Sequence, residues 1–166
     1  MSFNETQTHR ACIAIGSNLG ARESNIQKAL GFLEKHPEIS LNARSRLIET
    51  DAVGGAPDQP KYLNGTALLC TTLSPRALLE TLLSVEGSLG RDRSTAERNA
   101  PRTMDLDLLL YDDLVLNQKD LVVPHPRMHE RDFVLLPLAE IAPDFVHPKL
   151  NMTIAELAKR FSSGIG

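Results

Sequence analysis

The strongest constraint on the fold of this chain is the run from Arg98 to Tyr111, R-N-A-P-R-T-M-D-L-D-L-L-L-Y, which begins basic and ends apolar. Pro101 has no N–H to give to a sheet, so it suits the entrance of a strand. From Met104 onward, apolar and acidic residues alternate with period two. This pattern predicts a strand with Asp105 and Asp107 on one face, about 6–7 Å apart.

Two carboxylates at this spacing can hold Mg²⁺, which takes one or two carboxylates together with water and phosphate oxygens. Arg98 and Arg102 precede the acidic pair, and arginine binds phosphate in a bidentate way. The combination indicates phosphoryl-type chemistry. The alternative is a solvated outer face on which Arg102 only pairs with one acid. Four leucines around the pair instead favour a buried strand: Leu106, Leu108, Leu109 and Leu110.

The chain up to Tyr111 predicts a strand, helix, strand, strand, helix, strand order. Apolar periodicity and capping signals place these elements at Ala11–Ile15, Glu23–Lys35, Ile39–Ile48, Tyr62–Thr72, Ser74–Leu89 and Met104–Tyr111. The order predicts an α+β, ferredoxin-like split β-α-β sandwich, with helices on one face of a mainly antiparallel sheet. The other face would be free to carry a site under two long loops, at 49–61 and 94–100.

The remaining residues predict a small C-terminal extension. Short apolar runs at Leu114–Leu116 and Leu121–Val123 predict a small hairpin or flanking strands. A helix should begin near Arg127, and Pro137 should kink or divide the apolar stretch that follows. A short amphipathic helix is expected at Ile154–Phe161.

Length and composition limit the possible classes of protein. The 166 residues predict a single domain, 1–166, with residues 1–10 as a disordered or extended tail. The net charge of −3 argues against broad binding of nucleic acid or membranes. No apolar run approaches the roughly 20 residues of a membrane helix, and the first ten residues have no signal core. We therefore expect a cytoplasmic protein, monomeric because nothing suggests an obligate interface.

Three smaller features leave alternatives open. Cys12 and Cys70 lie in strand-like runs without metal-ligand spacing, which predicts buried free thiols. The turn Gly16–Gly20 can cradle a phosphate on its N–H groups, but it lacks the Lys-Ser/Thr of a P-loop and equally fits a structural turn. Tyr62 and Asn64 share a strand face, where they could stack on and hydrogen-bond a flat heterocycle. An edge-strand tyrosine with its hydroxyl in water is the alternative.

Several segments resemble the 6-hydroxymethyl-7,8-dihydropterin pyrophosphokinase family. The central run R-N-A-P-R-T-M-D-L-D-L-L-L is similar to the family signature. The other similar segments, in the family's order, are A-I-G-S-N-L-G, D-Q-P-K-Y-L-N, Glu86 with G-R-D-R after it, and V-P-H-P-R-M-H-E-R-D-F-V-L-L-P-L-A-E-I-A-P. The resemblance covers about Ala11 to Pro148.

The resemblance implies an enzyme that transfers the diphosphate of ATP to the hydroxymethyl group of a reduced pterin and releases AMP, in folate biosynthesis. It implies that Asp105 and Asp107 hold two Mg²⁺ ions. It implies a pterin site of Thr50, Val53, Tyr62, Asn64 and Phe133. It also implies contacts to ATP or its phosphates from Arg91, Arg93, Arg102, His125 and Arg131, with Glu86 and Leu108 near the nucleotide. Arg91 and Arg102 would act with the acidic pair in catalysis.

The chain departs from some family members in ways that affect the expected lid. Asn99-Ala100 stands where those members carry Trp-Gly, and Pro126 stands where they carry an aromatic residue. No residue stands out as a general base. Three rival functions are a different Mg²⁺ phosphohydrolase or nuclease, an RNA-binding module, and a homologue that binds without turnover.

Overall fold

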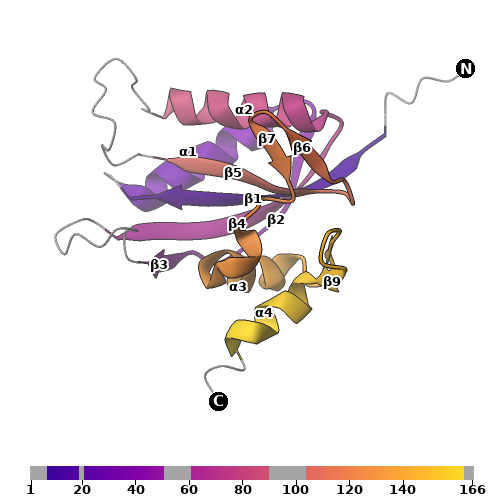
Figure 1. The fold of residues 1–166 in the computed structure, drawn as a ribbon. Coiled ribbons are helices and arrows are strands. Elements are labelled where there is room, and N and C mark those ends of the chain that lie inside the picture. Colours follow the sequence, from indigo (N-terminus) through magenta and orange to yellow (C-terminus); the bar gives the residue numbers. More distant parts are fainter. Residues whose placement is uncertain (1–6, 19–20, 51–60, 90–103, 163–166) are drawn as a thin grey trace, which may run out of the picture.

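The computed structural model describes residues 7–18, 21–50, 61–89 and 104–162. Five strands and two helices form the first two-thirds of the chain, and a hairpin, short helices and a second two-stranded piece form the rest (Figure 1). The elements are β1 His9–Ser17, α1 Arg22–Lys35, β2 Ile39–Arg44, β3 Ile48–Thr50, β4 Tyr62–Thr71, α2 Pro75–Ser88, β5 Asp105–Tyr111, β6 Leu116–Gln118, β7 Leu121–Val123, the 3₁₀ turn Met128–Glu130, α3 Asp132–Ile141, β8 Val146–His147, β9 Met152–Thr153 and α4 Ile154–Ser162.

The main sheet is antiparallel, with strand order β2-β4-β1-β5 and with β3 paired to the start of β4. The predicted order of elements and the antiparallel sheet are therefore confirmed. The strand predicted at Ile39–Ile48 is two strands. Between them, Ser45 N donates to Thr66 O at 2.9 Å, and Ser45 Oγ accepts from Thr66 N at 2.9 Å. The chain therefore continues along β4 in the same direction, and its register shifts between Arg44, which faces Ala67, and Ile48, which faces Asn64.

One face of the sheet packs on α1 and α2 (Figure 1). Alternate residues of the strands point into this core, as the period-two pattern predicts. Ser74 caps α2 by accepting from Ala77 N at 3.1 Å, as the Ser-Pro signal predicts. The fully buried members include Ile13, Ile26, Leu33, Leu69, Leu78 and Leu82. Each such side chain contributes about 1.5–3 kcal/mol by leaving water.

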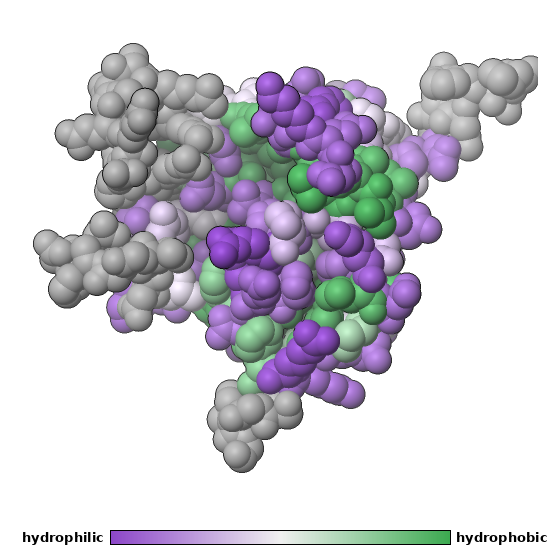
Figure 2. Space-filling view, in the orientation of Figure 1, coloured by the Kyte–Doolittle hydropathy of each residue, from purple (hydrophilic) through white to green (hydrophobic). Residues whose placement is uncertain are grey.

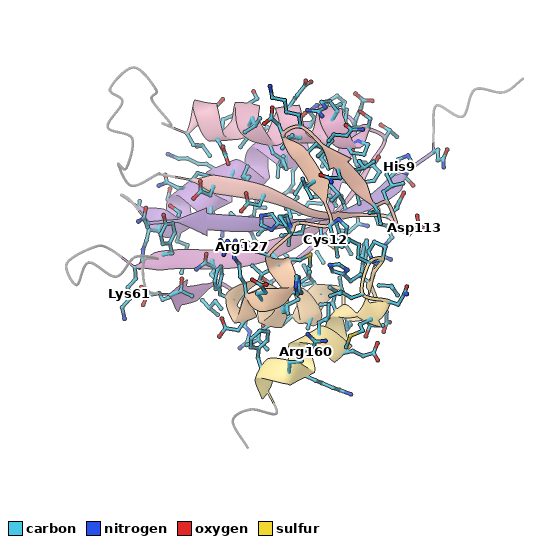
Figure 3. The ribbon with its side chains drawn as sticks, viewed as in Figure 1. His9, Cys12, Lys61, Asp113, Arg127 and Arg160 are labelled. Atoms are coloured by element: carbon cyan, nitrogen blue, oxygen red, sulfur yellow. The ribbon has the colours of Figure 1, made fainter. Side chains whose placement is uncertain are left out.

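We expected the other face of the sheet to be free, and this prediction is wrong. Helices α3 and α4 pack on that face (Figure 1). Figure 3 shows Cys12 between β1 and this layer, where burial raises the pKa of its thiol to about 12. Both cysteines are free thiols, and Cys70 is half-buried. The helices cover only part of the face, over the second core formed with Leu68, Leu109, Leu135 and Leu157. The extension therefore restricts any site on this face to the remaining part.

Strand β5 changes its alternation after Leu108. Its pairing with β1 shifts between Cys12 and Ile13, so that Ile13 faces Leu108 and Cys12 faces Leu110. The extra residue is Leu109, and both Leu109 and Leu110 join the second core. A β-bulge of this kind puts two successive side chains on one side. The acidic row therefore ends at Asp107, and apolar packing on α3 begins directly after it.

Three predicted boundaries differ from the structure. Strand β1 begins at His9, inside the segment predicted as a tail, because Asp112 accepts from Arg10 N at 2.8 Å and contacts His9 Nδ1 at 2.6 Å. The helix expected from Arg127 begins at Asp132, after the 3₁₀ turn. Pro137 does not divide that helix. Proline has no N–H to donate within the helix, but the buried residues around it pack α3 against the core.

The face seen in Figure 2 is largely hydrophilic, with apolar residues gathered beside the β6–β7 hairpin. Leu114, Val115 and Val122 are exposed there. Within the described ranges, no helix has the length and apolar character needed to cross a bilayer.

Candidate functional site

Asp105 and Asp107 lie at the start of β5 on the face that α3 and α4 partly cover. Their neighbours Met104, Leu106 and Leu108 are buried in the core on the opposite face, so alternation places both carboxylates together. Asp107 is exposed and Asp105 is half-buried. The predicted acidic face is therefore present, and it is not a fully buried ion pair.

The middle strand next to the acids carries small side chains. Gly16 pairs with Asp105 on one side and with Asn64 on the other, and Ala14 pairs with Asp107. Neighbouring strands lie about 4.8 Å apart, so Asn64 and Asp105 stand roughly 10 Å from each other across the glycine. A Cβ at Gly16 would come 3.2 Å from Asn64 Oδ1 and 3.8 Å from the Tyr62 ring. The missing side chain leaves room on the sheet between the amide and the acids.

The amide side of this row is held by β3. Thr50 pairs with Tyr62, and Thr50 Oγ1 accepts from Asn64 Nδ2 at 2.6 Å. Asn64 is 8% exposed, so the direction of its amide is fixed in a largely dry setting. Its Oδ1 lies toward Gly16, on the side of the acids. The structure thus brings together Thr50, Tyr62 and Asn64 as predicted, and it gives Thr50 a definite partner.

The residues that precede and begin α3 contribute an aromatic ring and positive charge. Phe133 is half-buried against the second core, and the Arg131 guanidinium lies 5.8 Å from the centre of its ring. His125 is held to β5 by its backbone N–H, which donates to Leu109 O at 2.9 Å. Phe133, Arg131 and His125 therefore come from the helical layer, and Asp107 comes from the sheet below.

The pKa of His125 depends on the charges of Asp107, Arg131 and Arg127, so these side chains lie near it. Burial lowers the pKa of His125, Asp107 opposes this effect, and Arg131 and Arg127 add to it. His125 Nδ1 accepts from Arg127 N at 3.2 Å, which leaves the proton on Nε2 in the neutral ring. His125 can therefore donate a hydrogen bond without carrying charge, beside an acid and two arginines.

Glu86 does not lie on the acidic face. It is 4% exposed in the last turn of α2, and its Oε2 accepts from Leu106 N at 2.7 Å. Leu106 is the residue between the two acids. Leu108, expected near the nucleotide, has its side chain buried in the first core, so only its backbone is available on the site side.

The acids suit a hard cation that brings ligands of its own. Among the described residues, no group of three or more His, Cys, Asp or Glu side chains could hold a metal ion. Two carboxylates can bind Mg²⁺ if phosphate oxygens and water fill the other coordination positions of the ion. A structural zinc site instead needs four protein ligands. Among the described residues, Asp105 and Asp107 are therefore the candidate ligands for such an ion.

Four predicted site residues lie outside the described part of the chain: Val53, Arg91, Arg93 and Arg102. Asn99 and Ala100, the departures from the family pattern, lie there too. A cavity of about 400 Å³ opens elsewhere, between α1 and the β2–β3 connection. No predicted site residue lines it, and its walls include Ile15, Ile26, Arg44 and Leu47.

The sequence reasoning missed Gly16, which lies beside the acids, and Asn18, which follows it in the chain. Gly16 was read only as part of a turn, although its pairing with both Asn64 and Asp105 depends on a register that no local pattern reveals. Asn18, two residues on, is 3% exposed, and its Oδ1 has no hydrogen-bond partner in the part of the chain that the structure describes. A buried acceptor of this kind suits a site that binds a donor.

Comparisons with known proteins agree with this geometry. The family model described as 7,8-dihydro-6-hydroxymethylpterin-pyrophosphokinase (HPPK) matches residues 12–143. This chain belongs to the HPPK family. The match includes the whole main sheet except the first residues of β1, together with α3, so the elements that carry the acids, Asn64 and Phe133 all lie within it.

Bacterial HPPK relatives cover most of the chain. A 2-amino-4-hydroxy-6-hydroxymethyldihydropteridine pyrophosphokinase of Synechocystis is 44% identical over 154 residues, which are 93% of this chain and 77% of the relative. The enzyme of that name from Pseudomonas aeruginosa is 45% identical over 139 residues, 84% of each chain. A Plasmodium falciparum HPPK-DHPS crystal structure is similar in fold, with a TM-score of 0.73 at 16% identity over 95% of this chain. This chain spans 45% of that one.

Proposed function

We propose that this HPPK-family chain transfers the diphosphate of ATP to the hydroxymethyl group of 6-hydroxymethyl-7,8-dihydropterin, releases AMP, requires Mg²⁺ and serves folate biosynthesis. The observation that carries the proposal is the row Asn64–Gly16–Asp105 across three neighbouring strands. It sets a group that can read a heterocycle beside a pair of carboxylates that can hold Mg²⁺. The relatives' shared name supports the choice of substrate.

The pterin has a defined place in this proposal. Its ring lies over Gly16, with Tyr62 and Phe133 stacking on it from the sheet and from α3. Asn64 reads its polar edge, and Thr50 Oγ1 holds the direction of that amide. Val53 is proposed to close the pocket from the first loop. This arrangement orients the hydroxymethyl oxygen toward the acids on β5, which is the main requirement when two substrates must meet in line.

The phosphates of ATP have positive and neutral donors around them. Arg131 supplies fixed charge, and neutral His125 donates from Nε2. Arg91, Arg93 and Arg102 are proposed to contact the phosphates as well, with Arg91 and Arg102 offsetting charge on the transferred group. When bound, two Mg²⁺ ions would neutralise phosphate charge and clamp oxygens, and Asp105 and Asp107 would hold them. The protein positions the reactants and contributes little covalent chemistry.

We also propose the finer fold class and state of the chain. The order β2-β4-β1-β5, with helices connecting β1 to β2 and β4 to β5, supports a ferredoxin-like split β-α-β core. A single domain of 166 residues, acting as a monomer in the cytoplasm, is the simplest form of such an enzyme. Light scattering on the purified protein would measure the monomer directly.

The acidic pair provides the decisive test. We expect ATP, Mg²⁺ and 6-hydroxymethyl-7,8-dihydropterin to give AMP and a diphosphorylated pterin, followed by phosphorus nuclear magnetic resonance. Asp105→Ala and Asp107→Ala should each remove this turnover while circular dichroism and the melting temperature stay near those of the parent chain. Asp144→Ala changes an exposed acid distant in sequence and should retain activity.

Two results would contradict the proposal. Near-parent activity in both acidic variants would remove the metal role. Release of AMP or phosphate at the same rate without pterin would instead indicate a phosphohydrolase.

A further inference from the structure

Glu86 occupies a place where a carboxylate is unfavourable unless it has a structural task. The buried stripe of α2 runs through Leu78, Leu82 and Val85, and Glu86 continues it into the sheet at 4% exposure. A buried carboxylate loses hydration, and a negative charge in the last turn opposes the helix dipole. The side chain therefore needs strong hydrogen-bond donors in its surroundings.

One of these donors is the backbone of β5 between the two acids. Among the described strands, β5 is the last in the sheet order, so no described strand pairs with its outer edge. Successive residues of an antiparallel strand turn their N–H groups to opposite edges. Leu106 N donates to Glu86 Oε2 at 2.7 Å in a buried setting. Glu86 thus accepts the hydrogen bond from Leu106 N that a neighbouring strand would accept in the interior of a sheet.

A second anchor holds the same edge beyond the acids. His125 N donates to Leu109 O at 2.9 Å, at the bulge that ends the acidic row. The backbone from Leu106 to Leu109 is therefore held at both ends from outside the sheet, and β1 holds it from inside. Asp105 and Asp107 stand on this segment, whose outer edge is held by Glu86 and by the backbone of His125.

We propose that Glu86 is a positioning residue: it fixes the backbone of Leu106 and thereby sets the direction and separation of Asp105 and Asp107. This inference rests on the proposed Mg²⁺ site and assigns Glu86 a role in the protein scaffold in place of a contact with the nucleotide. The amide oxygen of glutamine can accept the same hydrogen bond, so the task needs an acceptor and not the charge. Groups that orient metal ligands typically change metal affinity about 10–100-fold when they are removed.

The test compares Glu86→Gln with Glu86→Ala and uses Glu80→Ala, on the exposed side of the same helix, as the matched control. In the metal-free protein, amide hydrogen exchange at Leu106 should stay slow in Glu86→Gln and rise about tenfold or more in Glu86→Ala. Calorimetry with a non-hydrolysable ATP analogue should show that Glu86→Ala loses about tenfold in the Mg²⁺-dependent part of the affinity. Affinity without Mg²⁺ should stay unchanged in both variants.

Two outcomes overturn the inference. Unchanged exchange at Leu106 in Glu86→Ala would show that the bond does not hold the strand. Equal loss of Mg²⁺-nucleotide affinity in Glu86→Gln and Glu86→Ala, with Leu106 still protected in Glu86→Gln, would show that the charge contacts the ligand. If Glu86→Ala does not fold, Glu86→Asp, one methylene shorter, gives the same two readouts. Failure of the proposed function would appear separately, as absence of AMP in the parent chain.

Discussion

At the scale of single residues, the proposed pterin half of the site includes one buried hydrogen bond, between Asn64 and Thr50. Asn64 can present its amide in two directions, and only one of them suits a given pattern of donors and acceptors on a heterocycle. In this structure Thr50 Oγ1 accepts from Nδ2, and Oδ1 lies toward Gly16. The sequence placed Tyr62 and Asn64 on one face but could not reveal this pairing, because it joins two strands that are not adjacent in the sequence.

Thr50→Val keeps the shape of the side chain and removes the acceptor. We expect the affinity for 6-hydroxymethyl-7,8-dihydropterin to fall about 3–10-fold, the equivalent of roughly 0.5–1.5 kcal/mol for one hydrogen bond, with the affinity for ATP unchanged. Thr50→Ser retains the oxygen and is the control. Calorimetry with each ligand measures both effects. If the valine and serine variants bind pterin equally well, Thr50 does not orient the amide.

At the scale of elements, a buried histidine holds the β8–β9 turn of the C-terminal extension. His147 on β8 is 3% exposed, and its Nδ1 accepts from the backbone N–H groups of Lys149 and Leu150 at 3.3 and 3.2 Å. Its ring lies edge-on to His129, with ring centres 6.1 Å apart. Burial lowers the pKa of His147, and the nearby His129 and Lys149 lower it further. Protonation at Nδ1 would break both accepted bonds.

This arrangement predicts a loss of stability on acidification. Because the folded-state pKa of His147 lies below the ordinary value of about 6.5, the native state prefers the neutral ring. Its contribution to stability is complete above that value and falls as the pH drops toward the folded-state pKa. We expect the melting temperature to fall less steeply between about pH 7.5 and 5.5 in His147→Asn, whose Oδ1 can accept the same bonds without titrating. Identical slopes would show that other groups, His125 among them, cause the acid sensitivity.

At the scale of the whole molecule, the sheet joins two cores. Ile13 and Leu108 point into one core, and Cys12 and Leu110 from the same strands point into the other. Because each strand belongs to both cores, the extension and the first two-thirds of the chain should unfold together.

Leu157→Ala tests this coupling from the far side of the molecule. Leu157 on α4 is fully buried in the second core, so the substitution should lower the free energy of unfolding by about 2–5 kcal/mol. We expect one cooperative transition in urea, with circular dichroism and the tyrosine signal changing together. Leu150→Ala, at an exposed position, should have a small effect. Two separate transitions would contradict a single folding unit.

The sequence predicted the order of elements and the acidic face because both follow local rules of periodicity. It failed where distant segments decide the outcome. The β2–β3 break depends on a shift of register against β4, and the strand start at His9 depends on Asp112. The burial of Glu86 could not be predicted, because its hydrogen-bond donor, Leu106 N, lies 20 residues further along the chain. The covered second face was missed because a hydrophobic run does not reveal which side of a sheet it will join.

The glycine at position 16 has a consequence for inhibition of such an enzyme. A compound that lies flat on the backbone at Gly16 would contact a surface that few substitutions can alter. A substitution that adds bulk to exclude the compound would press on Asn64 Oδ1, 3.2 Å from the new carbon, and so disturb recognition of the natural substrate as well. Resistance by steric exclusion at this point should therefore come with a cost in fitness.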